Sequence, residues 1–111
     1  EIKQLDDLSS AFSFFVTSDW SKLSNYCQGK TDGQLYNDKL VPYAYLSKKL
    51  SSVASFRNDR LGATASLKRA IQIMIDSDKI REVSKQEMAQ KYNSTQRAFA
   101  LTDVSIIGVK N

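Results

Sequence analysis

The sequence predicts a mainly α-helical domain with a small β-hairpin, an α+β fold. Apolar residues recur at helical spacing in several stretches, and strand-forming residues gather near residues 80–85 and 97–102. The chain of 111 residues is long enough for one hydrophobic core and too short for two. Its composition, 41% hydrophobic and 25% charged, is that of a folded globular domain and differs from that of a disordered tail.

Two helices are predicted before residue 30. The first is an amphipathic helix over residues 4–16, whose apolar stripe consists of Leu5, Leu8, Phe12, Phe15 and Val16. Polar residues 17–19 can cap a second helix, which begins at Trp20 and ends near Gly29. The stretch "GKTDGQ" that follows contains two glycines, and we interpret it as a loop.

The middle of the chain predicts two further helices. Pro42 suits a first helical turn, and the apolar residues after it predict a helix to about residue 55. The polar stretch "RNDRLGAT" interrupts this pattern. From Thr64 or Ser66 the clearest helix of the chain begins, and its buried stripe is expected to consist of Leu67, Ala70, Ile71, Met74 and Ile75.

Residues 83–103 allow two interpretations. In a helix-turn-helix, Ser84 caps a helix with Glu87 at its third position, Asn93 takes the left-handed turn position, and residues 95–102 form a second helix. In a β-wing, residues 80–85 pair with residues 97–102, and residues 86–96 form the loop, in which a helical turn is possible at the start. Strand-forming residues without a helical stripe follow Phe99, which favours the wing.

The order of helix, turn and short strand is typical of a winged helix. The stretches "KLVPYAYLSKKL", "ASLKRA" and "KIREVSK" resemble, over residues 39–85, the eukaryotic ribosomal small-subunit protein twenty-five family. Ala65 stands where that family usually has glycine, and an insertion including "SFRNDRLG" separates the first two blocks. "SLKRAIQIMIDSDKI" also looks like the last helix of winged-helix modules in replication, telomere and silencing proteins. The order of the predicted elements indicates one winged-helix-like domain over residues 1–111, with residues 1–30 as an N-terminal helical extension and residues 34–111 as the winged-helix core.

Positive charge is concentrated in one part of the chain. Residues 1–38 hold three lysines and six acids, whereas residues 39–70 hold seven basic residues and one acid, Asp59. Clustered cations favour contact with a polyanion, because each neutralised phosphate releases counterions. The sequence therefore predicts a non-catalytic module that binds DNA, chromatin or structured RNA; a ribosomal small-subunit protein is a more specific form of this hypothesis. The expected contact residues are Lys48, Lys49, Arg57, Arg60, Lys68, Arg69 and Gln72.

The alternative hypothesis is a protein-interaction module. An acidic, aromatic N-terminal helix pair is an unusual addition to a minimal winged helix. Phe14 and Tyr45 fall outside the apolar stripes of their helices, and Ile73 lies at the margin of its stripe. If exposed, these three residues would form an interface for a homodimer or for a larger protein assembly.

The residues also argue against several other classes of function. Without histidine, the chain lacks the usual catalytic triads and metal clusters, and no cofactor or small-molecule substrate is expected. The single cysteine, Cys27, is predicted to be a core residue and is consistent with a reducing compartment, so we expect a nuclear or alternatively a cytoplasmic location. No apolar run is long enough to span a membrane. Because the chain begins at Glu1 without methionine, we expect it to be a fragment of a longer protein.

Overall fold

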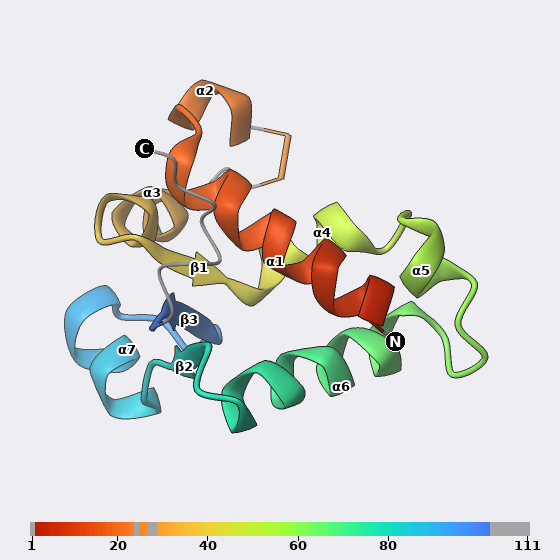
Figure 1. The fold of residues 1–111 in the computed structure, drawn as a ribbon. Coiled ribbons are helices and arrows are strands. Elements are labelled where there is room, and N and C mark those ends of the chain that lie inside the picture. Colours follow the sequence, from red (N-terminus) through yellow and green to blue (C-terminus); the bar gives the residue numbers. More distant parts are fainter. Residues whose placement is uncertain (1, 24, 27–28, 103–111) are drawn as a thin grey trace.

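A computed structural model describes residues 2–23, 25–26 and 29–102 of the chain. Within them it is mainly helical, with a small antiparallel sheet (Figure 1). The elements are α1 (Ile2–Thr17), α2 (Trp20–Leu23), α3 (Lys30–Asn37), β1 (Leu40–Pro42), α4 (Tyr43–Leu50), α5 (Ala54–Arg57), α6 (Ala63–Asp76), β2 (Ile80–Glu82), α7 (Lys85–Tyr92) and β3 (Ala98–Leu101). Cys27 and the strand-forming residues beyond Thr102 lie outside the described residues.

The principal core lies between α1, α4, α6 and one face of the sheet. α1 confirms the predicted N-terminal helix and crosses both α4 and α6 (Figure 1). Its stripe residues Leu8, Phe12 and Phe15 are fully buried, because helical spacing places them on the same side of the helix. The stripe of α6 is also buried, at Leu67, Ala70, Ile71 and Met74, and Ile75 packs at its margin.

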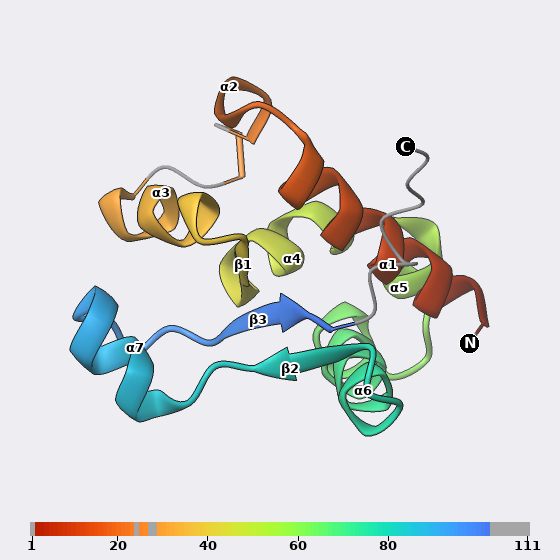
Figure 2. The ribbon, with the colours of Figure 1, turned by 60° about the vertical axis from the view of Figure 1, so that its left-hand side comes forward.

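The sheet has three strands in the order β1-β3-β2, one more than the predicted hairpin. β2 and β3 pair as the wing interpretation predicted, with Arg81 opposite Ala100 (Figure 2). β1 joins the other edge of β3, with Leu40 opposite Ala100. The sequence prediction missed β1 because a three-residue strand that is buried along its whole length shows no alternation.

The segment between β2 and β3 contains features of both interpretations. It forms a two-turn helix, α7, in which the Ser84 hydroxyl accepts a hydrogen bond from the Glu87 amide at 3.1 Å, as the capping pattern predicted. Asn93 ends α7 in the predicted left-handed conformation, at φ 51°. The second helix of the helix-turn-helix interpretation, over residues 95–102, is wrong because residues 98–101 form β3.

α7 and α3 cover part of the second face of the sheet. There Leu35, Leu40, Met88, Tyr92 and Ala98 form a smaller core together with Val83. The Tyr92 hydroxyl donates a hydrogen bond to the Asp38 carboxylate at the end of α3. Burial and this carboxylate raise the pKa of Tyr92 to about 12, so the phenol remains a donor at neutral pH. The Tyr92 side chain therefore links α7 to the end of α3.

Three sequence predictions of helix bounds need correction. The stretch "GKTDGQ" is largely helical, within α3, although we predicted a loop. Leu35, which follows this stretch, is the one fully buried residue of α3, so no apolar stripe indicated a helix. The helix predicted from Trp20 to near Gly29 is assigned as α2 over only Trp20–Leu23. The helix predicted from Pro42 to residue 55 is divided into α4 and α5, and Pro42 is the N-cap of α4 instead of a residue of its first turn.

Candidate nucleic-acid interface

The outer side of α6 was predicted to carry the contact residues. Lys68 and Gln72 are exposed, as that prediction requires. Gln72 donates its side-chain amide to Asp76 at 2.9 Å, so its nitrogen already has an acceptor one turn along the helix. The second amide hydrogen and the carbonyl oxygen of Gln72 can still contact a phosphate or a base while this bond is kept. Lys68 has no hydrogen bond or ion pair within the described part of the chain.

Arg69 differs from the prediction, because it points toward α1 and lies in a polar cluster. Its Nη2 atom is 3.0 Å from the Asp59 carboxylate and 3.3 Å from the Gln4 side-chain oxygen. Gln4 is almost fully buried, at 4% exposure, and its Nε2 atom also donates to the Ser55 carbonyl at 2.8 Å. Arg69 thus connects α6 to α1 and to the link before α6. The Arg69 side chain is 40% exposed, but its Nη2 atom donates hydrogen bonds within the protein.

Asp59 organises this cluster as an acceptor. The backbone amide of Leu61 donates to one carboxylate oxygen at 2.8 Å, and Gln4 and Arg69 donate to the other. The Leu61 amide, followed by Gln4 and Arg69, holds the pKa of Asp59 below its usual range. Asp59 is the single acid that the sequence places among the seven basic residues, and it engages one of them.

The remaining predicted cations fall into two groups. Lys48 on α4 and Arg60 in the link before α6 are exposed, and among the described residues they have no ion pair. Arg57 is exposed and donates to the Ser52 carbonyl at 3.1 Å. Lys49 is only half-exposed, because its ammonium lies 4.5 Å from the ring centre of Phe14 and 5.0 Å from that of Tyr26. Lys49 is therefore a packing residue to a larger extent than we predicted.

Two of the exposed cations are close in sequence to residues that line a small crevice between α4 and α6. The end of α4 meets the start of α6 at this crevice, whose volume of about 10 Å³ is too small to enclose a phosphate and whose lining includes Leu50 and Leu67. Hydroxyl residues line its walls: Ser47, Ser51 and Thr64. Lys48 follows Ser47 on α4, and Lys68 lies one turn after Thr64 on α6. Lysines and hydroxyl groups are the side chains that commonly contact phosphate oxygens.

Leu61 was not singled out by the sequence analysis. Its side chain is 63% exposed at the tip of the link before α6, beside Arg60. Gly62 follows at φ 90°, a backbone conformation that suits glycine, and it lets the chain turn into α6. The sequence offered no signal for Leu61, since a single leucine in a polar stretch does not belong to any apolar pattern.

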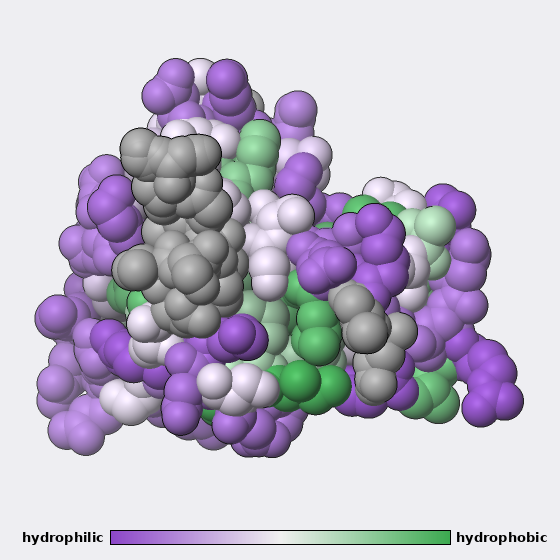
Figure 3. Space-filling model, viewed as in Figure 1, coloured by the Kyte–Doolittle hydropathy of each residue, from purple (hydrophilic) through white to green (hydrophobic). Residues whose placement is uncertain are grey.

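The predicted protein-interface residues do not form one surface. Tyr45 is fully buried, so its prediction is wrong: its ring packs against Phe15, and its hydroxyl donates to the Ala11 carbonyl at 2.7 Å. Phe14 is half-buried beneath the Lys49 ammonium. Ile73 is half-buried on the other side of α1, in a groove of about 310 Å³ between α1 and α6 (Figure 3, where an apolar strip follows this hollow).

Comparisons with protein-family models, with curated proteins and with solved structures found no significant match. In the part of the chain that is described, no helix has the length and apolar character needed to cross a membrane. The same residues contain no group of three acidic, cysteine or histidine side chains placed to hold a metal ion.

Proposed function

We propose that this chain is a non-catalytic winged-helix module that binds nucleic acid, either DNA or structured RNA. The observation that carries the proposal is a group of exposed cations that have no ion pair with any described residue: Lys48 on α4, Arg60 before α6 and Lys68 on α6. These side chains can exchange water and counterions for phosphate oxygens without breaking an internal bond.

The topology supports the winged-helix part of the proposal. A helix precedes β1, two helical segments and α6 follow it, and a hairpin of β2 and β3 comes last. β1 pairs with β3 in the antiparallel sheet, so the hairpin lies beside the helical bundle. A winged helix has this order of elements, and α7 then lies within the wing. α6 corresponds to the helix that enters a groove in many such modules.

In the proposed complex, phosphates of the nucleic-acid backbone lie on the surface above the crevice between α4 and α6, which is too small to enclose them. Lys48 and Lys68 approach them from the two helices, and the hydroxyl groups of the crevice donate shorter hydrogen bonds. Arg57 and Arg60 contact flanking phosphates. Arg69 and Lys49 position the elements and do not contact the ligand. Contacts of this kind give affinity with little sequence information.

Salt-dependent binding to two nucleic acids tests the proposal. Anisotropy titrations with a labelled 20-base-pair DNA duplex and with a labelled RNA hairpin, from 50 to 200 mM salt, give the slope of log affinity against log salt. For Lys48→Ala/Lys68→Ala we expect weaker binding and a slope smaller by about 1.8 for duplex DNA, because two phosphate contacts are lost. The matched control is Lys22→Ala/Lys85→Ala, which removes the same charge from exposed positions outside the crevice.

The two variants give a clear contrast. An equal change in slope for both pairs of substitutions would show that binding responds only to net charge and would contradict the proposed interface. Absence of binding to either nucleic acid at 50 mM salt would reject the function itself.

A second candidate function is protein association through the groove at Ile73. It is favoured by the apolar side chains of Leu5, Ile73 and Met74 in the hollow between α1 and α6. Sedimentation velocity at several concentrations tests self-association. A dimer that dissociates on Ile73→Lys would support this function, whereas a monomer at all concentrations would contradict self-association.

A further inference from the structure

A second groove lies at one end of the sheet, between the start of β1, the end of β3 and the last turn of α1. Its floor is a row of residues that the strand register aligns across the sheet, Leu40 on β1, Ala100 on β3 and Arg81 on β2. α3 and α7 cover the neighbouring part of the sheet, through contacts with Leu40 and Ala98, and leave the row open at one end. The groove has a volume of about 450 Å³, which is sufficient for several side chains of a partner.

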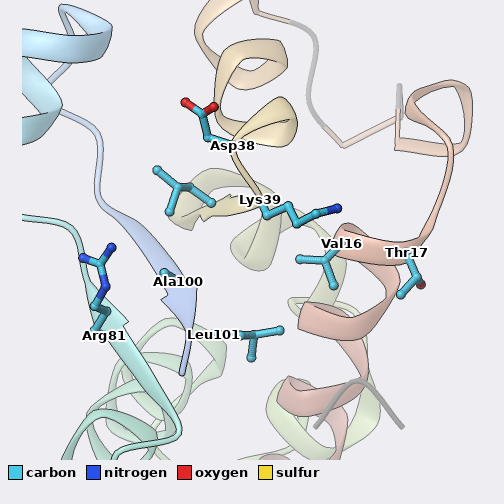
Figure 4. A pocket seen from close by; sticks show the side chains of 8 residues that line it. Val16, Thr17, Asp38, Lys39, Arg81, Ala100 and Leu101 are labelled. Carbon is cyan, nitrogen blue, oxygen red and sulfur yellow. The ribbon is translucent and has the colours of Figure 1, made fainter. Parts of the chain in front are cut away.

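The groove is apolar at its centre and carries a cation at each side. Val16 from α1, together with Leu101 and Ala100 from β3, supplies half-buried apolar surface. Figure 4 shows Arg81 on one side of Ala100 and Lys39 extending toward α1 on the other side. An apolar floor between two separated cations fits a partner that has apolar side chains between carboxylates.

The two cations are available to a partner. Lys39 and Arg81 are exposed, and neither has an ion pair or a hydrogen bond from its side chain within residues 2–23, 25–26 and 29–102. Asp38, the acid that lines the same groove, accepts the hydroxyl of Tyr92 and is thereby held toward α7. The charge that the groove presents is therefore mainly positive.

Lys39 also has an unusual backbone conformation. It lies between α3 and β1 at φ 60°, in the left-handed region that glycine adopts more easily. A lysine at this position places a long cationic side chain at the border of the groove, where glycine would have none. The position gives the groove a charge at a small cost in backbone strain.

We propose that this groove, formed by Val16, Lys39, Leu40, Arg81, Ala100 and Leu101, binds an acidic peptide segment of a partner protein, with apolar side chains on the sheet and carboxylates at Lys39 and Arg81. The peptide surface is separate from the crevice between α4 and α6, and it goes beyond the proposed nucleic-acid binding. Because the charged groups are exposed, they contribute mainly to specificity and to the rate of association, and the apolar floor contributes the area.

Three labelled peptides of ten residues test the proposal by fluorescence anisotropy with the full chain. The first has two central leucines flanked on each side by two aspartates, with glycine and serine at the ends. The second replaces the leucines with serine, and the third replaces the aspartates with lysine. We expect saturable binding of the first peptide and affinities at least tenfold lower for the other two.

Charge exchange makes the test specific to the groove. Lys39→Glu/Arg81→Glu should weaken the aspartate peptide at least fivefold and should strengthen the lysine peptide. Lys22→Glu/Lys85→Glu, which reverses two exposed charges outside the groove, is the matched control and should leave the preference unchanged. Circular dichroism verifies that each variant is folded.

Three outcomes would overturn the inference. They are no saturable binding of the aspartate peptide, an equal effect of the groove and control reversals, and displacement of the bound peptide by duplex DNA that competes through Lys39 and Arg81. The last result would assign the groove to nucleic acid. Because Lys48 and Lys68 are unchanged in all these variants, failure here leaves the proposed nucleic-acid function intact.

Discussion

Lys68 and Arg69 are adjacent on α6, but the two flanks of the helix on which they lie have different surroundings. The flank toward α1 carries Arg69, which is bonded to Gln4 and Asp59. The flank that begins at Thr64, beside α4, carries Lys68, which is exposed and has no ion pair among the described residues. Formal charge therefore differs from available charge: the Asp59 carboxylate already offsets the charge of Arg69, so an external anion is attracted less strongly to Arg69 than to Lys68.

The largest expected effect comes from the buried stripe that separates the two flanks. Ile71→Ala removes a fully buried side chain and should lower the free energy of unfolding by about 2–5 kcal/mol, because a cavity remains beneath α6. Urea unfolding followed by circular dichroism measures this loss. Nucleic-acid affinity below the unfolding transition should be unchanged, and a large affinity loss in a folded variant would show that the flanks do not act independently of the stripe.

Alanine substitutions of Lys68 and Arg69 should affect different measurements, the salt slope for Lys68 and the melting temperature for Arg69. Lys68→Ala should reduce the salt slope of DNA binding by about 0.9 and leave the melting temperature nearly unchanged. Arg69→Ala should lower the melting temperature by about 4 °C or more, because its bonds to Asp59 and Gln4 are lost, and should leave the slope unchanged. An Arg69→Ala variant with the slope of Lys68→Ala would contradict the division into a binding flank and a structural flank.

Asp59 gives the structural flank a dependence on pH. Its folded pKa lies below the ordinary value of 3.8, so the ionised carboxylate stabilises the fold at neutral pH. This stability is present above pH 4 and is lost as the pH falls through the folded pKa. The difference in melting temperature between the wild type and Asp59→Asn should therefore be largest near neutral pH and should shrink as the pH falls below 4. If the difference in melting temperature instead grew as the pH fell below 4, the pKa of Asp59 would be raised by folding and not lowered.

The smallest effect is expected at Lys49, which we predicted from the sequence to contact phosphate. Lys49→Met keeps the apolar stem and removes the ammonium over Phe14 and Tyr26, so it should cost about 0.5–1 kcal/mol of unfolding free energy. The salt slope should change less than in Lys48→Met, which alters an exposed cation of the same helix. Equal changes of the salt slope in Lys49→Met and Lys48→Met would show that Lys49 also contacts the nucleic acid.

Periodic patterns in the sequence were sufficient for the long helices and for the hairpin. The stripes of α1 and α6 each hold four or more apolar residues at helical spacing, and the structure buries them. Ser84, Glu87 and Asn93 indicated the bounds of α7 under the helix-turn-helix interpretation, because a cap and a left-handed residue act locally, whereas the favoured wing interpretation placed a loop over residues 86–96. Short elements were missed: α3 and β1 are held by contacts distant in sequence, and eight or fewer residues leave little pattern to detect.

The candidate sites also depend on contacts between residues that are distant in sequence, which the sequence patterns did not predict. The seven basic residues could be found by counting, but the count could not separate Lys48, Arg60 and Lys68 from Lys49 and Arg69. The acceptor of Arg69 includes Gln4, which is 65 residues away in the chain. The groove of Lys39 and Arg81 depends on a strand register that joins residues 40, 81 and 100.

By itself, the sequence determined which helix faces are buried and where positive charge is concentrated, because spacing and composition are properties of neighbouring residues. Only the tertiary structure decided which cations remain available and where an apolar floor lies between two of them. The physical reason is that hydrogen bonds, ring contacts and strand register bring together groups that are distant along the chain. Each such contact decides whether a charged side chain has a partner within the protein or remains available to a ligand.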